Sequence, residues 1–147
     1  MASFLNHVAW VVEDQQAAIN FLVTHFGCEA GPPRVISGAW AEELAQIKGV
    51  HVTYVGVTSP GTETRIALLK FVTPPSEPNN SVDVLYLKGF RHIGFLVDDI
   101  DAKKSELEAA GFKFFSDVVT VDLFNSRTVY FRGPERVVVQ LTEQLSS

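Results

Sequence analysis

The sequence has little cysteine, no excess of basic residues and no long hydrophobic run, and each of these absences excludes a class of protein. The single cysteine, Cys28, excludes an internal disulfide framework and a zinc site built on cysteines. Twelve basic residues stand against 17 acidic ones, and the resulting net charge of −5 argues against nucleic acid or an anionic membrane as the main partner. No apolar stretch approaches the roughly 20 residues of a membrane span, and the first residues lack the basic run of a secretion signal. We therefore expect a cytoplasmic protein.

What the sequence does contain is the composition of one folded domain. The chain has 147 residues, of which 46% are hydrophobic and 20% are charged. These proportions are typical of a chain that folds rather than of a disordered tail. A chain of this length buries about 70% of the surface that its unfolded form exposes, so its core needs no disulfide or structural metal.

The chain repeats itself. The octet HVAWVVED at residues 7–14 matches the octet HIGFLVDD at residues 92–99, with His7 aligned to His92 and Asp14 aligned to Asp99. Each octet is rich in β-branched and aromatic residues and predicts a strand. Each closing aspartate stands where it can cap the N-terminus of a following helix. The sequence therefore consists of two copies of one supersecondary unit.

The same sequence of elements is expected in both copies. The helices should end at Gly27 and Gly111, where glycine adopts the left-handed conformation. Three strands should follow in each copy, at residues 30–36, 51–57 and 65–71 in the first and at residues 112–115, 128–131 and 137–142 in the second. We thus predict an α+β fold made of two βαβββ modules, at about 4–73 and 89–145, which together form a single domain.

Two segments fall outside the repeat. A linker rich in proline and asparagine, at residues 74–88, joins the two copies, because proline interrupts both helices and central strands. An insertion at residues 37–47 predicts a short helix that is capped by Ser37. On that helix Trp40, Leu44 and Ile47 would share one face.

This arrangement resembles the vicinal oxygen chelate superfamily, which includes glyoxalases, bleomycin-resistance proteins and extradiol dioxygenases. The two octets carry the resemblance, together with the segments RIALLKF at 65–71 and YFRGPERVVVQL at 130–141. The resemblance implies a cupped, open, eight-stranded mixed sheet around a cleft, in which the first and last strands of each module are neighbours. It also implies that one side chain from each of those four strands points toward a divalent metal.

Carried over residue by residue, the resemblance implies His7, His92 and Gln140 as metal ligands. The fourth position falls on Ala67, where the family usually has glutamate or glutamine. Two imidazoles and an amide oxygen suit Fe, Ni, Co, Mn or Zn, but without a carboxylate the affinity should be low. The site is therefore either weak, with open positions that water or a carboxylate from Glu42, Glu43 or Glu63 fills, or absent. Taken singly, each histidine is also compatible with a purely structural role.

Strand alternation extends the predicted substrate pocket. If Ala67 faces the cleft, so do Arg65 and Leu69, and if Gln140 faces it, so does Val138. Arg65 can hold a substrate carboxylate through a two-pronged hydrogen bond, although an arginine near a strand end is often simply solvated. Aromatic walls can come from Trp40 and Tyr130, although Trp40 can equally anchor its own helix. Cys28 reads as an inert buried thiol.

Two functions remain open at this point. The first is a metal-dependent lyase, isomerase or dioxygenase, whose small oxygenated substrate chelates the metal through two neighbouring oxygens. Its catalytic base is unidentified, and Glu42 and Glu43 are weak candidates. The alternative is a metal-free protein that binds an antibiotic or an aromatic metabolite and confers resistance. In both cases the partner is a small molecule, and family analogy alone suggests a homodimer.

Overall fold

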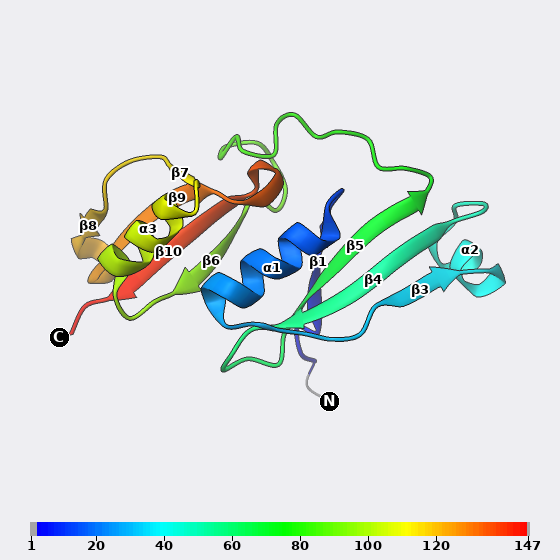
Figure 1. Ribbon diagram of the computed structural model, residues 1–147, viewed down its shortest axis with the longest axis horizontal. Coiled ribbons are helices and arrows are strands. Elements are labelled where there is room, and N and C mark those ends of the chain that lie inside the picture. Colours follow the sequence, from blue (N-terminus) through cyan, green and yellow to red (C-terminus); the bar gives the residue numbers. More distant parts are fainter. Residues whose placement is uncertain (1–2, 147) are drawn as a thin grey trace. The chain divides into compact units, whose positions relative to one another are not determined.

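Figure 1 shows the computed structural model, which describes residues 3–146. The chain forms two compact units, Met1–Pro78 and Asn79–Ser147, which we call module 1 and module 2. The boundary between them lies inside the predicted linker. No helix among the described residues is both long and apolar enough to cross a membrane.

Module 1 is a five-stranded mixed sheet with two helices. Its elements are β1 (His7–Val11), α1 (Gln15–Phe26), β2 (Glu29–Ala30), β3 (Arg34–Ser37), α2 (Ala39–Ala45), β4 (His51–Thr58) and β5 (Arg65–Thr73). The strand order is β1-β5-β4-β2, and β3 also pairs with β4. The first strand, β1, runs parallel to the last strand, β5, whereas β2, β3 and β5 pair antiparallel with β4. The prediction that first and last strands are neighbours is confirmed here.

Module 2 repeats this plan. Its elements are β6 (His92–Leu96), α3 (Ile100–Ala109), β7 (Lys113–Phe114), β8 (Val119–Val121), β9 (Ser126–Arg132) and β10 (Val138–Gln144), with short 3-10 turns at Asp122–Phe124 and Pro134–Arg136. The strand order is β6-β10-β9-β7, and β8 also pairs with β9. As in module 1, the first strand, β6, runs parallel to the last strand, β10. The α+β fold of two modules is confirmed.

Each sheet has five strands rather than the expected four. The strand predicted at residues 30–36 is divided into β2 and β3 because Gly31, Pro32 and Pro33 lie between them, and proline has no N–H to donate to the ladder. In module 2 the corresponding edge of the sheet is also formed by two short strands, β7 and β8, of which only β7 was expected. The sequence gives β8 only three residues, too short for a periodicity to show.

Both repeated helices begin and end as predicted. The carboxylate of Asp14 accepts a hydrogen bond from the Ala17 amide at 3.0 Å, and that of Asp99 accepts one from the Ala102 amide at 3.0 Å. At the other ends, Gly27 and Gly111 have positive φ values of 63° and 97°. The aspartates and glycines of the repeat therefore fix the lengths of α1 and α3.

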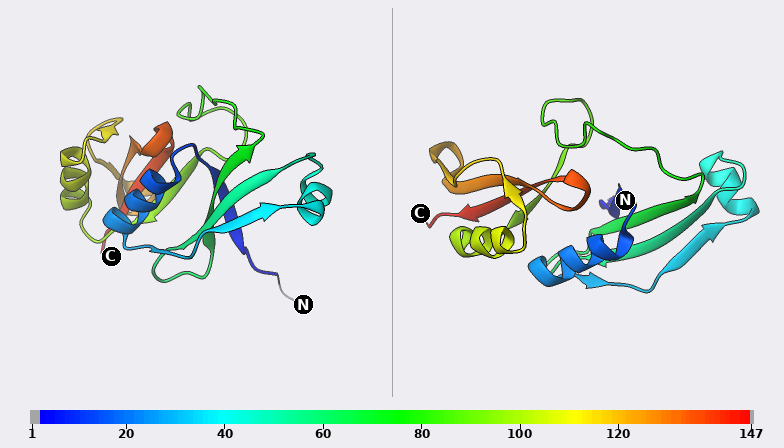
Figure 2. Two further views of the ribbon diagram at one scale, coloured as in Figure 1. Left: turned by 45° about the vertical axis from the view of Figure 1, so that its right-hand side comes forward. Right: turned by 45° about the horizontal axis from the view of Figure 1, so that its top comes forward.

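One helix covers one face of each sheet, and the opposite face we call the open face of that module (Figure 2). In module 1 the covered face buries Val12, Val57 and Leu68 with Ala18 and Leu22 of α1. In module 2 the corresponding core consists of Ile100, Leu107, Phe131, Val139 and Leu141, all at most 1% exposed. These fully buried residues alternate along the strands with the residues of the open faces.

The short helix α2 exists, but two predictions about it were wrong. Its N-cap is Gly38 rather than Ser37, and no side chain caps it. Its buried residue is Ala41, whereas Trp40 is 57% exposed. Ala41 packs with Val50 and Val52, so the face of α2 that meets the sheet is the one with Ala41 rather than the one with Trp40. Of the predicted apolar face, only Ile47 joins this cluster.

The second half of the predicted linker packs onto module 2. The carboxylate of Asp83 accepts hydrogen bonds from Arg132 at 2.9 Å and from Arg136 at 2.8 Å. The guanidinium of Arg91 donates to the carbonyls of Ser81 and Val84, at 2.6 and 2.8 Å. Residues 79–91 are thus held by charge-assisted hydrogen bonds rather than by regular secondary structure.

The Asp83 cluster predicts a specific pH dependence of stability. The guanidinium groups of Arg136 and Arg132 lower the pKa of Asp83 to about 2. Because the folded-state pKa lies below that of the unfolded chain, the cluster stabilises module 2 above about pH 4, and this contribution is lost as the pH falls from about 4 to 2. Asp83→Asn should therefore be less stable at neutral pH and should lose less stability across that window.

Urea denaturation followed by circular dichroism at a series of pH values measures this effect. Asp117→Asn is the matched control, since Asp117 is an exposed aspartate of the same module whose carboxylate has no hydrogen-bond partner in the described part of the chain. If Asp83→Asn and Asp117→Asn showed the same pH profile as the unaltered chain, the structural role of the cluster would be refuted.

Candidate functional site

The register of the parallel strand pairs positions the predicted ligands. In module 1, His7 of β1 lies opposite Arg65 of β5, and Ala67 lies two residues further along β5. In module 2, His92 of β6 lies opposite Val138 of β10, and Gln140 lies two residues further along β10. Residues at matched or alternate positions of paired strands face the same side of a sheet. Each histidine therefore shares the open face of its module with the mapped residue of the last strand.

The tautomer of His7 follows from its neighbours. The side-chain oxygen of Asn6 lies 2.7 Å from Nδ1 of His7 and accepts a hydrogen bond from Arg65 at 3.2 Å. Because arginine can only donate, the Asn6 atom that faces it is the amide oxygen, and Nδ1 of His7 must carry a hydrogen. In the neutral ring the lone pair is then on Nε2. A histidine that binds metal through Nε2 has this tautomer, and its Nδ1–H donates to a neighbouring acceptor.

The amide of Gln140 is also oriented by its neighbours. Its Nε2 donates to the hydroxyl of Thr128 at 2.8 Å, while that hydroxyl donates to the Leu141 carbonyl at 2.8 Å. The amide oxygen has no hydrogen-bond partner within residues 3–146 and lies on the side of Gly94, 4.0 Å from where a Cβ of that residue would be. Beside it, the ring of His92 packs edge-on against Tyr130 at 5.3 Å. Glycine thus leaves open space next to an available acceptor.

The donors within each module are of kinds that divalent metals accept: an imidazole in module 1, and an imidazole with an amide oxygen in module 2. Imidazole nitrogens and an amide oxygen are all neutral ligands of the first-row divalent metals. Ala67, at 2% exposure, adds only a methyl group to this face. No group of three or more His, Cys, Asp or Glu side chains is gathered anywhere in residues 3–146. A metal held by these residues would therefore keep most of its positive charge.

The structure does not bring Glu42 or Glu43 to His7, whereas Glu63 precedes Arg65, the strand partner of His7, by two residues. Glu42 and Glu43 belong to α2, and α2 packs against a cluster that includes Phe71. Phe71 lies six residues beyond Arg65 on β5, about 20 Å from the His7 end of the strand at roughly 3.3 Å per residue. Trp40 is part of the same distant helix. The catalytic roles of the two glutamates, and the wall formed by Trp40, stay predictions without support from the fold.

The remaining predicted pocket residues differ in accessibility. Arg65 and Leu69 share the open face with Ala67, and Arg65 is exposed. Tyr130 contacts both His92 and Phe115 through ring packing. Val138, in contrast, is completely buried. Cys28 is buried as expected, and this burial raises the pKa of its thiol.

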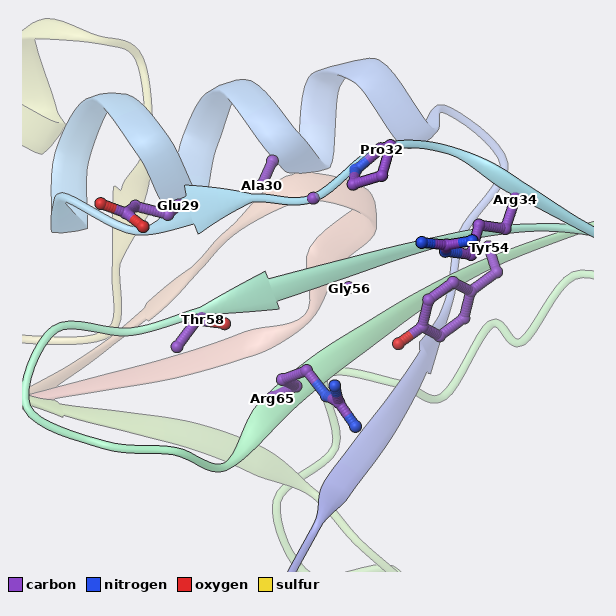
Figure 3. A pocket seen from close by; sticks show the side chains of 9 residues that line it. Glu29, Ala30, Pro32, Arg34, Tyr54, Gly56, Thr58 and Arg65 are labelled. Atoms are coloured by element: carbon purple, nitrogen blue, oxygen red, sulfur yellow. The ribbon is translucent and has the colours of Figure 1, made fainter.

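A pocket of about 340 Å³ opens on module 1 (Figure 3). It is lined by residues of β2, β3, β4 and β5 and of the turn between β2 and β3, namely Glu29, Ala30, Gly31, Pro32, Arg34, Tyr54, Gly56, Thr58 and Arg65. Of these, sequence reasoning identified only Arg65. The signal that could have found the others is strand pairing, since Arg34 lies opposite Tyr54, and Thr58 lies opposite Arg65.

The position of Tyr54 depends on a glycine. A Cβ at Gly56 would lie 2.8 Å from the Tyr54 hydroxyl, closer than such atoms approach in proteins. The tyrosine ring therefore lies along β4, over the backbone of Gly56, which pairs with Ala67. The turn between β2 and β3 is tied to the same residue, since the Gly31 amide donates to the Gly56 carbonyl at 2.8 Å, whereas Pro32 has no N–H to donate.

Comparison with known proteins identifies the class to which this fold and face belong. The family model described as the glyoxalase/bleomycin resistance protein/dioxygenase superfamily matches residues 6–131. The chain therefore belongs to this superfamily, whose members bind small molecules and often use divalent metals.

Individual relatives support the same assignment. The chain is 27% identical over 143 residues to the uncharacterized protein YaeR of Escherichia coli, with 95% of each chain covered. It is similar to the crystal structure of a glyoxalase family protein from Bacillus cereus, with a TM-score of 0.87 and 28% identity over 96% of this chain and 93% of that one. TnmS3, an antibiotic-binding protein from Streptomyces, shares the fold with a TM-score of 0.60 and 21% identity over 97% of both chains.

The contact between Asn6 and His7 yields a prediction that requires no metal. At a pH where imidazoles are ordinarily neutral, the His7 ring should carry its hydrogen on Nδ1. Asn6→Ala removes the acceptor, so the ring should change to a mixture with hydrogen on Nε2. Two-bond ¹H–¹⁵N NMR correlations of the imidazole distinguish the two forms. Asn80 is an exposed asparagine whose side chain bonds to no other described residue, so Asn80→Ala should leave the His7 signals unchanged.

Proposed function

We propose that this protein is a metal-dependent enzyme of the vicinal oxygen chelate type that acts on a small oxygenated substrate. His7, His92 and Gln140 would hold a divalent metal, and two neighbouring oxygens of the substrate would complete its coordination. When bound, the metal supplies Lewis-acid stabilisation of negative charge that develops on those oxygens. The reaction class is a lyase, isomerase or dioxygenase reaction.

The observation that carries this proposal is the available oxygen of Gln140 beside His92. Thr128 takes the amide hydrogen, so the oxygen is the free end of the side chain, and Gly94 leaves space in front of it. No buried side-chain oxygen of the described residues lacks a partner, so the unbonded oxygen of Gln140 reaches solvent and an incoming metal would only have to displace water from it.

The histidine of module 1 is supported separately. Asn6 fixes the tautomer that leaves Nε2 of His7 free. That His7 acts together with the two ligands of module 2 rests on the equivalence of the two octets and on the family resemblance. The position of Ala67 provides no fourth ligand, so the site would have low affinity and several exchangeable positions.

Metal titration tests the proposal. Isothermal titration of the chelator-treated protein with Mn, Fe, Co, Ni and Zn should show one site, with a preference among the metals. His7→Ala, His92→Ala and Gln140→Ala should each weaken it, by about 100-fold for the histidines, because a lost ligand costs at least as much as a lost outer-shell partner. Thr128→Val should weaken it less, by roughly 10-fold, since the amide loses only its orientation.

Two controls keep this result interpretable. His51→Ala removes a histidine of module 1 that is not a candidate ligand, and it should retain the affinity of the unaltered protein. Circular dichroism should show that all variants are folded. If none of the five metals binds, or if His51→Ala is as damaging as His7→Ala, the metal site is refuted.

None of the four mapped positions, His7, Ala67, His92 and Gln140, carries a carboxylate, and this favours a second candidate function. In this alternative the same faces bind a small molecule without metal. The similarly folded TnmS3 is an antibiotic-binding protein, which is consistent with such a role. Metal-independent binding of aromatic compounds, measured by isothermal titration of the chelator-treated protein, would support it. The homodimer and the cytoplasmic location expected from the sequence remain proposals, and the first is tested by analytical ultracentrifugation.

A further inference from the structure

We infer that the pocket of module 1 binds an oxyanion, either a carboxylate or a phosphate group, between Arg34 and Arg65. This inference rests on the proposed function only in assigning that oxyanion to the substrate. The pocket, its charges and its hydrogen-bond donors are formed by residues of module 1 alone and require no metal.

The first observation is that both arginines lack a carboxylate partner. Within residues 3–146, the side chain of Arg34 makes no hydrogen bond or ion pair, and that of Arg65 donates only to Asn6. A guanidinium group has five N–H donors, so most of the donors of both side chains are free to bind a ligand. They line one pocket, although they come from separate strands, β3 and β5.

The second observation is the direction of the side chains. In Figure 3 the hydroxyl of Tyr54 extends toward the side of Arg65, while the guanidinium of Arg34 lies beside the Tyr54 ring. The Tyr54 hydroxyl has no hydrogen-bond partner among the described residues, so it is a third free donor. Its position is maintained by Gly56, because any larger residue there would displace the ring.

The third observation is the balance of charge. The pocket contains two guanidinium groups and one carboxylate, that of Glu29. Thr58 pairs with both Glu29 and Arg65, so these two residues lie two strand spacings apart, about 10 Å, and they form no ion pair among the described residues. On β4 the partner of Arg34 and the partner of Glu29 are four residues apart, about 13 Å along the strand. This exceeds the Debye length of about 8 Å at physiological salt, so Glu29 does not neutralise Arg34.

The chemistry of these groups specifies the ligand. Arginine recognises planar carboxylates and phosphates through paired, charge-assisted hydrogen bonds, and two arginines with a hydroxyl between them suit a group with several oxygens. The pocket borders His7, because Arg65 is its direct partner in the strand register. The residues proposed to hold the metal carry no negative charge, and the bound oxyanion would supply it. A neutral aromatic compound would leave these donors unpaired.

NMR titration of the full-length ¹⁵N-labelled protein tests the inference, with inorganic phosphate and malonate as probes at constant ionic strength. Saturable shifts should appear at Tyr54 and Gly56. Arg34→Gln and Arg65→Gln should each weaken phosphate binding by about 10-fold, since charge-assisted hydrogen bonds are the strong ones. Tyr54→Phe should weaken it by only a few-fold. Tighter binding of malonate than of phosphate would identify a carboxylate ligand, and the reverse a phosphate.

Lys48→Gln is the matched control, because it removes one exposed positive charge from module 1 outside the pocket. The inference is overturned if phosphate and malonate do not saturate, or if Lys48→Gln weakens binding as much as the arginine variants do. Repeating the titration after chelation separates the two proposals. Arginine-dependent binding without metal would uphold the pocket even if the metal site failed. If the protein binds metal, but Arg34→Gln and Arg65→Gln leave the affinity for phosphate and malonate unchanged, the metal site is upheld and the anion pocket is refuted.

Discussion

The parallel pairing of the first strand with the last strand in each module is the constraint on which the rest of the structure depends. Both β1 and β6 open with a histidine, and each is paired with a strand that comes much later in the sequence. The register then decides which side chains share a face. Because the side-chain period of a strand is two, a slip of one residue would turn Ala67 and Gln140 into the helix-covered core. The buried alternate positions, such as Leu68 and Leu141, prevent that slip.

The elements that could be predicted from the sequence are those whose signals are local. Asp14 and Asp99 cap helices, Gly27 and Gly111 end them, and the octets form strands, because each depends on a few consecutive residues. The pairing of first and last strands came from the family resemblance rather than from periodicity. The short strand β8 was not predicted, because three residues are too few to show the alternation of a strand.

The pocket of module 1 was not predicted from the sequence, for a different reason. Arg34, Tyr54 and Arg65 come from three strands, and only the pairing of these strands shows that they lie on one face. The alternation of side chains within one strand identifies Arg65 on β5, but it cannot identify Arg34 and Tyr54, which belong to other strands. The inclination of Tyr54 over Gly56 is a contact within one strand, yet it depends on the absence of a side chain, a signal that periodicity does not contain. Periodicity likewise placed Trp40 on the apolar face of its helix, but Trp40 is exposed and Ala41 joins the buried cluster instead.

The two modules use their arginines differently, although they descend from one pattern. In module 2 every arginine is bonded to the protein: Arg132 and Arg136 to Asp83, Arg127 to Asp101, and Arg91 to backbone carbonyls. At the strand position opposite the histidine, module 2 has the buried Val138, and module 1 has the exposed Arg65. The arginines of module 2 therefore stabilise the fold, whereas those of module 1 keep their donors free. A protein with a net charge of −5 repels anions at long range, so an anion can be held only where unpaired cations are concentrated, and the open face of module 1 has two.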